Sequence, residues 1–380
     1  MKKRIFFYVQ HLLGIGHLRR AAALSRALAE RFDVLLVSGG APVPDLALGR
    51  ARFHQLPSLK ARDESLRELS RLDGSPADAA FCAARAKALV ELLQAEAPDI
   101  IITEQFPFGR TRLRFELLPM LEAAKALQRR PVVLSSIRDV LRDTVSTERV
   151  AETLETFDTY FDGVLIHADP DLVNLSMSFP GWSHIEARAH YTGYVGESAL
   201  TQAPVTADGT GEVVVSVGGG AVGGALLNAA LVARPLTSLA DRTWRLLLGA
   251  NLGETEQAAL RARASRGVVI EPARRDFTGL LANAALSISQ AGYNTVVETL
   301  SCAERAVLVP FATARETEQT RRARILAERG MVQMVPAAEL SGRALAAAVE
   351  RALAGRSIRS FPRCDVNGGA ATAALLARMV

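Results

Sequence analysis

Short apolar runs alternate with longer amphipathic or alanine-rich stretches along this chain of 380 residues, and the alternation restarts past the middle. The apolar runs contain few polar residues, which is typical of parallel strands covered by helices on both faces. We therefore predict an α/β protein with parallel sheets. The strands expected in the first half are 4–9, 33–38, 99–103, 132–137 and 163–167, with helices at 18–30, 77–95, 111–127 and 148–157.

The segment 196–211 interrupts this alternation. It is rich in Gly, Ser, Thr, Ala and Pro and has no periodicity, so we interpret it as a linker. We predict two Rossmann-like domains, residues 1–195 and 212–355, that face one cleft, followed by a final segment 356–380. The strands expected in the second half are 212–217, 244–248, 268–271, 285–289, 306–310 and 332–335, and the last helix is expected at 369–379.

Charge and cysteine usage narrow the class of protein. The formal net charge is +5, but the arginines are scattered, and aromatic residues make up only 6% of the chain. A nucleic-acid-binding surface favours a clustered basic stripe with aromatics, so we expect no nucleic-acid partner. Three isolated cysteines without metal-ligand spacing fit a reducing compartment. Because no apolar run is long enough to span a bilayer, we expect a cytoplasmic protein.

Glycines follow the first predicted strand of each half. The turn GIGH, residues 14–17, matches a dinucleotide fingerprint only in part, because Arg19 stands where the third glycine belongs. NAD binding is therefore disfavoured there. The turn GGGAVGG, residues 218–224, has no Walker lysine, yet backbone N–H groups at the start of the following helix could hold phosphate. An ordinary strand–helix turn without a ligand is the alternative interpretation of the second turn.

The stretch SQAGYNTVVE, residues 289–298, follows a predicted buried strand. Gly292 permits a tight turn, and Asn294 or Thr295 can cap the helix that follows. Glu298 then lies one turn inside this helix. A carboxylate placed there can accept hydrogen bonds from both hydroxyls of a ribose, although a solvated helix residue is the plainer interpretation.

A carboxylate–amide pair, Glu318-Gln319, follows the next strand and opens another helix. These groups suit the hydroxyls of a sugar, although Glu in a first helical turn is also favoured by the helix dipole. The order strand, xGxNTxxE, strand, Glu-Gln resembles the nucleotide-sugar domain of GT-B glycosyltransferases, especially glycosyltransferase family 28 with its MurG-type members. It is also similar to the HCGWNSxxE…DQ signature of plant and antibiotic UDP-glycosyltransferases. The resemblance implies the GT-B fold, with a C-terminal helix that returns to the first domain.

The resemblance also implies a UDP-sugar site in the second domain. Glu298 would bind the ribose, while Glu318 and Gln319 would hold hydroxyls of the donor sugar. Arg274 and Arg275 lie in a segment that resembles the uracil-reading loop and could meet phosphate. Position 290 is Gln where plant enzymes have a His, and the Glu318 position is Gln in MurG-like enzymes. The residues implied to lie along the diphosphate are Gln290, Gly292, Asn294, Thr295 and the turn Gly218, Gly219 and Gly220.

The first domain would bind the acceptor. Histidine suits proton removal near neutral pH, and many inverting members of the resembled family place a His in the turn after the first strand. We predict His17 as the base, in a turn with Gly14 and Gly16, and Glu104 as the carboxylate that orients it. His11 is the competing base. One base and one direct displacement give inversion at the anomeric carbon, and the family requires no metal.

The predicted function is transfer of a sugar, a hexosamine such as GlcNAc by family proximity, from a UDP-sugar to a glycan, lipid-linked or small-molecule acceptor. The alternatives are a nucleotide-sugar hydrolase or epimerase on the same fold, and a non-catalytic UDP-sugar-binding subunit. Apart from the UDP-sugar as co-substrate, we expect no cofactor.

Two further sequence features bear on whether the protein binds a metal ion and whether it contacts a membrane. The form Asp169-Pro170-Asp171 could bind a divalent cation, but a helix start with Asp169 as N-cap is the favoured interpretation. A lipid-linked acceptor would place the protein at the inner face of the membrane. The segment 111–130 mixes basic and apolar residues and could supply a peripheral contact, although an ordinary amphipathic helix is the plainer interpretation.

Overall fold

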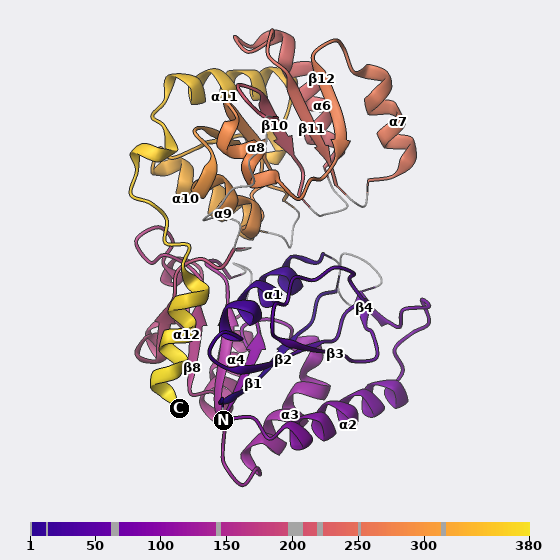
Figure 1. The fold of residues 1–380 in the computed structure, drawn as a ribbon, viewed down its shortest axis with the longest axis vertical. Helices are drawn as coiled ribbons and strands as arrows, with labels where there is room; N and C mark the ends of the chain where they lie inside the picture. The colour runs from indigo at the N-terminus through magenta and orange to yellow at the C-terminus, as the bar shows by residue number, and fades with distance from the viewer. Residues whose placement is uncertain are drawn as a thin grey trace. The chain divides into compact units, whose positions relative to one another are not determined.

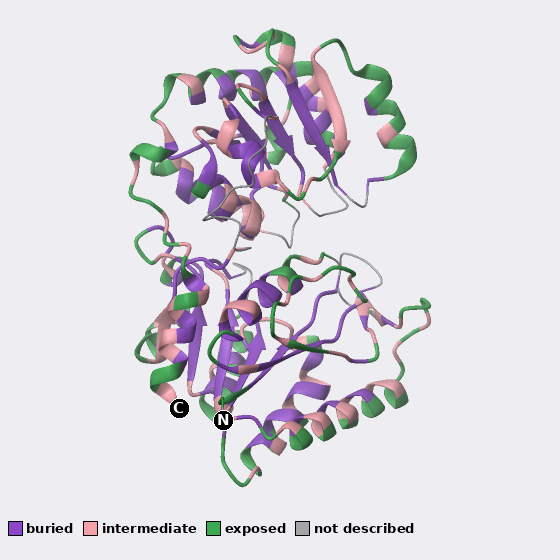
Figure 2. Cartoon of the chain, viewed as in Figure 1, coloured by how far each residue is buried: buried purple, intermediate pink, exposed green. Residues whose placement is uncertain are grey.

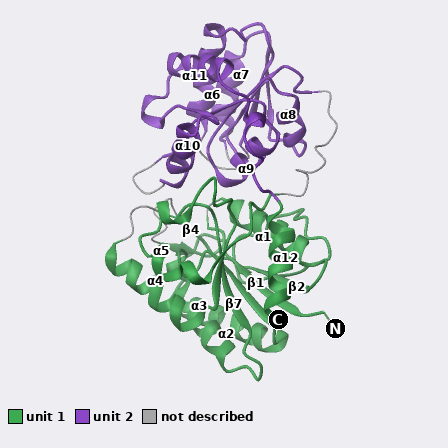
Figure 3. Ribbon diagram, turned by 90° about the vertical axis from the view of Figure 1, so that its left-hand side faces the viewer, with its two compact units in different colours: residues 1–141, 145–197, 367–380 green, residues 142–144, 198–366 purple. Residues whose placement is uncertain are grey.

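A computed structural model describes residues 2–12, 14–61, 68–141, 146–196, 208–218, 223–249, 252–312 and 317–380. The chain divides into two compact units, which Figure 3 colours separately. The first unit contains residues 1–141, 145–197 and 367–380, and the second contains residues 142–144 and 198–366. Each unit is a parallel sheet covered by helices, which confirms the predicted fold class.

The first unit has a seven-stranded sheet in the order β3-β2-β1-β6-β7-β8-β9, and every pairing in it is parallel (Figure 1). The inner strands are buried along most of their length (Figure 2). Its strands are β1 Arg4–Val9, β2 Asp33–Ser38, β3 Arg52–Gln55, β6 Ile100–Glu104, β7 Val132–Ile137, β8 Gly163–Ile166 and β9 Ala189–Tyr191. A small antiparallel pair, β4 Lys60–Ala61 and β5 Leu69–Ser70, lies outside this sheet.

Helices cover both faces of the first sheet because successive side chains of a strand point to opposite sides. Ile5 and Phe7 of β1 pack with α1, Gly16–Leu28, and with the C-terminal α12, Gly368–Met379. Tyr8, the residue after Phe7, points to the other face, toward α2, Ala79–Glu96, and α3, Arg114–Lys125. The expected return of the last helix to the first unit is therefore confirmed. The remaining helices are α4 Thr147–Tyr160 and α5 Trp182–Ile185, with short 3-10 turns at Thr111–Leu113, Leu175–Met177 and Glu186–Arg188.

The second unit repeats this architecture with a six-stranded parallel sheet in the order β12-β11-β10-β13-β14-β15. Its strands are β10 Val213–Ser216, β11 Trp244–Leu248, β12 Val268–Pro272, β13 Leu286–Ser289, β14 Ala306–Leu308 and β15 Gln333–Met334. Its helices are α6 Gly224–Ala233, α7 Glu254–Arg263, α8 Phe277–Asn283, α9 Tyr293–Cys302, α10 Glu318–Glu328 and α11 Gly342–Ala354, with 3-10 turns at Arg234–Leu236, Ala337–Glu339 and Ile358–Ser360. Val213 and Val215 pack against α6 and α11, and Val214 packs against α8.

The sequence does not predict the edge strands β3 and β9. Their residues, RFHQ and AHY, are partly or largely exposed, and neither forms an apolar run. A strand at the edge of a sheet is covered less than an inner strand, so its sequence carries less of the hydrophobic signal.

Residues 169–173 form a turn, so the predicted helix start at Asp169 is wrong. Oδ1 of Asp169 accepts a hydrogen bond from the N–H of Asp171 at 3.0 Å. Its carbonyl oxygen accepts the N–H groups of Leu172 and Val173 at 3.0 and 2.9 Å. The helical pattern stops there because Asn174 is extended, with φ −90° and ψ 134°.

The segment 111–130 forms a 3-10 turn and helix α3. The apolar side chains of Leu117, Met120 and Leu121 are buried in the first unit, whereas Arg129 and Arg130 are exposed. Most of its apolar surface is therefore used for packing, as expected of an ordinary amphipathic helix. No helix within the described ranges is long and apolar enough to cross a membrane.

Candidate active site

The order of strands reverses once in each sheet, between β1 and β6 in the first unit and between β10 and β13 in the second. At such a switch point the connections leave neighbouring strands in opposite directions, which opens a crevice beyond the carboxyl ends of the strands. His17 lies in the helix after β1, and Glu104 ends β6. Gly218 follows β10, and Gln290 follows β13. The predicted site residues therefore concentrate at the two switch points.

In the first unit, His17 is the second residue of α1, which begins at Gly16 with Ile15 as N-cap. Glu104 is fully buried at the end of the adjacent strand, and Nδ1 of His17 lies 2.7 Å from its Oε1. The His17 side chain stays 20% exposed, so part of the ring is accessible to small molecules. At Gly14 a Cβ would meet no atom within 4 Å, so the turn is open there.

Arg20 lies one turn further along α1, on the same face as His17. Its Nη2 lies 2.5 Å from Oε1 of Glu104, and both side chains are almost completely buried. The Glu104 carboxylate is thus held by an imidazole and a guanidinium. This pairing explains how a charged group is tolerated at a buried strand end.

The electrostatics of this cluster favour a neutral imidazole. Burial lowers the pKa of His17 well below 6.5, and the Arg138 guanidinium lowers it further, which together outweigh the opposite effect of Glu104. Burial alone raises the pKa of Glu104, but His17, Arg20 and Arg110 outweigh burial and hold that pKa well below its usual value. Glu104 is therefore ionised at neutral pH and accepts the Nδ1 proton, which leaves the Nε2 lone pair as the basic position.

Arg138 is a member of this cluster that sequence reasoning missed. It follows β7, the neighbour of β6 in the sheet, and its Nη2 contacts Nε2 of His17. Arg110, in the loop after β6, also acts on the pKa of His17 and Glu104. The available signal was the position of Arg138 directly after an apolar strand, at the same sheet edge as Glu104.

His11, the competing base, follows β1 and is 4% exposed. A Cβ at Gly40 would lie 2.3 Å from Nδ1 of His11, so the ring packs tightly against that backbone. Burial lowers the pKa of His11, and the charge of Arg110 lowers it further. His11 is thus neutral but far less accessible than His17, which favours His17 as the base.

A buried network supports the backbone that follows β1. Nε of Arg85 lies 2.5 Å from Oε2 of Glu116, and both side chains are fully buried. The hydroxyl of Tyr8 donates to Glu116, and Nη2 of Arg85 donates to Oε1 of Gln10 at 2.8 Å. Nε2 of Gln10 in turn donates to the carbonyl oxygen of His11 at 2.8 Å. The partners lie far apart in sequence, so no local pattern signals this network.

In the second unit, Gly218 has φ +66°, a left-handed conformation that favours glycine. Its N–H donates to Oγ of Ser216 at 3.3 Å. A Cβ at Gly218 would lie 3.7 Å from Oγ1 of Thr295, so the turn after β10 and the first turn of α9 are neighbours. The N–H of Gln290 donates to the carbonyl oxygen of Ser216 at 3.3 Å, which joins the two strand ends. Gly219 and Gly220 lie outside the described residues.

Helix α9 begins at Tyr293, with Gly292 as N-cap in an extended conformation of φ −61° and ψ 148°. The prediction that Asn294 or Thr295 caps this helix is wrong, because both lie inside its first turn. Gly292 has no side chain with which to cap the helix, and a Cβ at this position would meet nothing within 4 Å. The first backbone N–H groups of a helix have no partner within it, so this helix start can donate hydrogen bonds to an anion.

Three polar side chains share one face of α9. Asn294, Thr295 and Glu298 are partly exposed, whereas Val296 and Val297 between them are buried. Positions three and four apart lie on the same side of a helix. Glu298 is therefore on the face that carries the first-turn residues implied to lie along a diphosphate.

Gln319 joins the ends of β13 and β14. Its Oε1 accepts the N–H groups of Ala291 and Phe311, each at 3.1 Å. The amide oxygen is therefore committed to the protein, and only the NH2 group can donate to a ligand. Arg322, one turn further along α10 and 1% exposed, donates from Nη1 to the carbonyl oxygen of Ala291 at 2.8 Å. Glu318 is partly exposed at the first position of α10.

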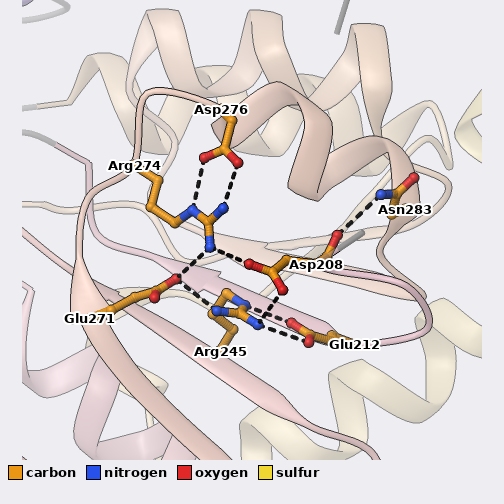
Figure 4. Close-up of polar contacts among 7 residues, drawn as sticks. All are labelled: Asp208, Glu212, Arg245, Glu271, Arg274, Asp276 and Asn283. Carbon is orange, nitrogen blue, oxygen red and sulfur yellow. Dashed lines mark hydrogen bonds and ion pairs between the residues drawn. The ribbon is translucent and has the colours of Figure 1, made fainter. Parts of the chain in front are cut away.

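Arg274, which the sequence places in a position to meet phosphate, is engaged by carboxylates in this structure. Its guanidinium forms a two-pronged pair with Asp276, at 2.8 and 2.5 Å, and contacts Asp208 at 2.6 Å and Glu271 at 3.4 Å (Figure 4). A phosphate would have to displace these carboxylates, so we do not assign Arg274 to phosphate. Arg275 is exposed in the same loop between β12 and α8.

Arg245 of β11 completes the network of Figure 4. It lies 2.7 Å from Glu212, which precedes β10, and 2.9 Å from Glu271 of β12. These pairs tie three neighbouring strands to the loop that leads into α8. In the part of the chain that the structure describes, no three His, Cys, Asp or Glu side chains are grouped so that they could hold a metal ion.

Comparison with known proteins bears first on the second unit. Residues 214–361 match the family model of the glycosyltransferase family 28 C-terminal domain. A curated relative from Geotalea uraniireducens, the UDP-N-acetylglucosamine–N-acetylmuramyl-(pentapeptide) pyrophosphoryl-undecaprenol N-acetylglucosamine transferase, is 28% identical over 158 residues. That match covers 39% of this chain and 43% of the relative, so it spans less than half of either protein.

Similarity of fold extends over the whole chain. The calicheamicin glycosyltransferase CalG4 has a TM-score of 0.66 at 15% identity, over 100% of this chain and 98% of its own. MurG of Acinetobacter baumannii has a TM-score of 0.60 at 18% identity, over 99% of this chain and 100% of its own. These likenesses show the two-unit fold, and the family match falls on the unit that carries xGxNTxxE.

Proposed function

We propose that this chain, whose second unit belongs to the MurG-like glycosyltransferases of family 28 and whose fold is GT-B, transfers a sugar from a UDP-sugar to an acceptor hydroxyl. The observation that carries the proposal is the family 28 match over the switch point of the second unit. The second unit would bind the donor, and the first unit would bind the acceptor and supply the base.

The start of α9 is the proposed seat of the donor diphosphate. Gly292 leaves its approach open, and the helix presents N–H groups without partners in the helix, next to the hydroxyl of Thr295 and the turn at Gly218. These neutral donors suit a diphosphate because a helix N-terminus stabilises negative charge. Arg274 is not required for this role.

Glu298 and the first turn of α10 would bind the two sugars of the donor. A carboxylate accepts hydrogen bonds from two neighbouring hydroxyls, which suits Glu298 to the ribose. Glu318 would accept from hydroxyls of the transferred sugar, and the NH2 group of Gln319 would donate to them. We propose a hexosamine such as GlcNAc as that sugar, because the Geotalea uraniireducens relative is an N-acetylglucosamine transferase.

His17 would act as the general base. Its Nδ1 proton is held by Glu104 at 2.7 Å, so the neutral ring presents Nε2 as proton acceptor. The acceptor oxygen attacks the anomeric carbon, and its proton passes to Nε2. The bond between that carbon and the diphosphate oxygen breaks, and its electron pair leaves with UDP. One displacement inverts the anomeric carbon, and we propose that it proceeds without a metal ion.

The acceptor would be a glycan, a lipid-linked sugar or a small molecule. A lipid-linked acceptor is supported by the Geotalea uraniireducens relative, whose name gives a pyrophosphoryl-undecaprenol substrate. For such an acceptor we propose that the protein works in the cytoplasm at the inner face of the membrane.

A nucleotide panel tests the donor half of this proposal. We expect UDP and UDP-GlcNAc to raise the melting temperature of the full chain, because a ligand that binds only the folded state stabilises it. ADP and NAD are the matched controls and should have little effect. Stabilisation by NAD without any response to UDP would overturn the proposal.

Product analysis separates a transferase from its alternatives. We expect UDP release from UDP-GlcNAc to depend on an added acceptor. Free GlcNAc formed at the full rate without acceptor would indicate a hydrolase, and formation of the C2 epimer of the sugar would indicate an epimerase. UDP binding with no turnover under any condition would indicate a binding subunit.

A further inference from the structure

The contact between Arg138 and His17 has a consequence for the proposed reaction, and it rests on His17 being the base. Nη2 of Arg138 points at Nε2 of His17, the ring atom that must accept the proton of the acceptor hydroxyl. Nδ1 is already engaged by Glu104 at 2.7 Å, so the ring has no second basic position. In this state the base is covered.

Arg138 cannot share the proton transfer. A guanidinium stays protonated at every pH at which proteins function, and it has donors but no acceptor. It therefore holds the Nε2 lone pair in a hydrogen bond without taking part in the reaction. The acceptor hydroxyl can reach Nε2 only after the guanidinium moves.

The groups around His17 limit what can move the Arg138 guanidinium. Arg20 and Glu104 are buried and paired at 2.5 Å, and Arg110 adds a second positive charge. Arg138, directly after β7, and Arg110, in the loop after β6, are both partly exposed, and of these two it is Arg138 whose guanidinium contacts Nε2 of His17. A planar guanidinium binds a carboxylate or phosphate in a two-pronged geometry, which is stronger than its bond to a neutral imidazole.

We propose that Arg138 is a specificity-determining residue that covers Nε2 of His17 until an anionic group of the acceptor, a phosphate or a carboxylate, draws its guanidinium away. Acceptor binding then uncovers the base beside the attacking hydroxyl. Water brings no such anion, so it finds the base covered, and the donor sugar is protected from hydrolysis. The acceptor class that follows is one with an anionic group close to the hydroxyl that is glycosylated.

The first test measures the accessibility of Nε2 and needs no sugar donor. Diethyl pyrocarbonate modifies neutral imidazole, and mass spectrometry of the full chain after digestion reports each histidine. We expect Arg138→Met to speed modification of His17 by about tenfold, since a charge-assisted hydrogen bond of at least about 1.4 kcal/mol is removed. Arg138→Lys, which keeps a positive charge and N–H donors but not the planar guanidinium, should give an intermediate rate. Arg31→Met, at an exposed position before β2, is the matched control and should leave the rate unchanged.

Two other histidines calibrate this measurement. His184, whose side chain is 47% exposed, should react fast in every variant, and His11, which is buried, should react slowly. An unchanged His17 rate in Arg138→Met with intact folding by circular dichroism would overturn the covering role.

A second set of modification rates tests whether an anion draws Arg138 away from His17. We expect inorganic phosphate to speed modification of His17 in the unmodified sequence, relative to chloride at the same ionic strength, and to have no effect on Arg138→Met. If His17 is modified rapidly in Arg138→Met, but phosphate does not speed its modification in the unmodified sequence, Arg138 does not recognise an anion.

The last experiment measures whether Arg138 protects the donor sugar from hydrolysis during turnover. We expect Arg138→Met to raise acceptor-free release of UDP from UDP-GlcNAc several-fold, as water attacks the anomeric carbon and gives its proton to Nε2. The double variant with His17→Ala should lose this gain. If no variant releases UDP from UDP-GlcNAc even when acceptors are added, the proposed function fails, while the modification rates still decide whether Arg138 covers His17. Turnover that is equal in Arg138→Met and the unmodified sequence would overturn the protective role.

Discussion

The two switch points are built from different kinds of groups. At the end of β6, Glu104 is buried and ionised, with His17 and Arg20 as partners at 2.7 and 2.5 Å. At the end of β13, the groups on offer are the N–H donors at the start of α9 and partly exposed side chains such as Thr295 and Glu298. Burial shifts pKa values and suits proton transfer, whereas exposed neutral donors suit binding of a charged ligand. This difference supports the proposal that the first unit supplies the base and the second unit recognises the donor.

The charged networks of the two units also differ in burial. Arg85 and Glu116 of the first unit are fully buried, whereas Arg274 of the second unit is 24% exposed among its carboxylates. Removal of one partner from a buried pair leaves a charge without solvation, while an exposed pair can be replaced by water. We therefore expect the buried network to contribute more to the stability of the fold than the partly exposed contacts of Arg274.

The substitution His17→Ala is the strongest test of the proposed difference between the two units. We expect turnover of UDP-GlcNAc to fall by about 10² to 10⁴-fold, the usual contribution of a general base. The stabilisation of the protein by UDP should stay the same, because the proposed donor residues lie in the second unit. Steady-state kinetics and thermal shift measure the two effects. A variant with normal turnover would assign the base to another residue, with His11 as the next candidate.

Arg85→Met tests the buried network. We expect unfolding free energy to fall by about 3–5 kcal/mol, because Glu116 loses its partner inside the first unit. Chemical denaturation measures the effect. Arg274→Met is the matched control and should change stability much less. It should also leave UDP affinity unchanged, and a large loss of UDP affinity would restore Arg274 as a phosphate ligand.

Glu298→Gln tests recognition in the second unit. We expect the Kd for UDP to rise by about 10 to 100-fold, since hydrogen bonds to a charged carboxylate contribute about 1.5–3 kcal/mol. The kcat at saturating donor should change little, and isothermal titration with UDP gives the Kd. Glu256→Gln, on the exposed surface of α7, is the control. An unchanged Kd for Glu298→Gln would remove this residue from the donor site.

The pH dependence of kcat/KM is expected to show the smallest of these effects. Burial, reinforced by Arg138, holds the pKa of His17 well below 6.5, so the base is neutral across the neutral range. We expect kcat/KM to stay flat as pH falls to about 6.5 and to decline only below it. Arg138→Met should move this acid limb to higher pH, because the nearby cation is removed. An acid limb above 6.5 in the unmodified protein would contradict a depressed pKa.

The same shift makes stability depend on pH. Below about 6.5 the unfolded chain protonates His17, while the folded protein keeps it neutral. The unfolded state then binds more protons, so the His17 contribution to stability falls as pH drops from about 6.5 toward the folded pKa. His17→Ala should remove this part of the pH dependence.

Inner strands were predicted from sequence to within one or two residues at most ends. The strand β1 was predicted at 4–9 and lies at Arg4–Val9, because buried parallel strands are continuous apolar runs. The edge strands β3 and β9 escaped prediction since they are short and partly exposed. The cap of α9 was assigned to Asn294 or Thr295, because a polar side chain signals a cap more clearly than Gly292, whose backbone alone adopts the N-cap conformation.

The linear sequence determined the α/β rhythm, the two glycine turns and the xGxNTxxE and Glu-Gln motifs, since these depend on residues close together in the chain. Only the tertiary structure decided which distant groups meet. It placed Glu104 and Arg138 beside His17, and it engaged Arg274 with carboxylates that include Asp208. The physical reason is that burial, ion pairing and pKa depend on distances across neighbouring strands, and parallel strands that are far apart in sequence end at the same sheet edge.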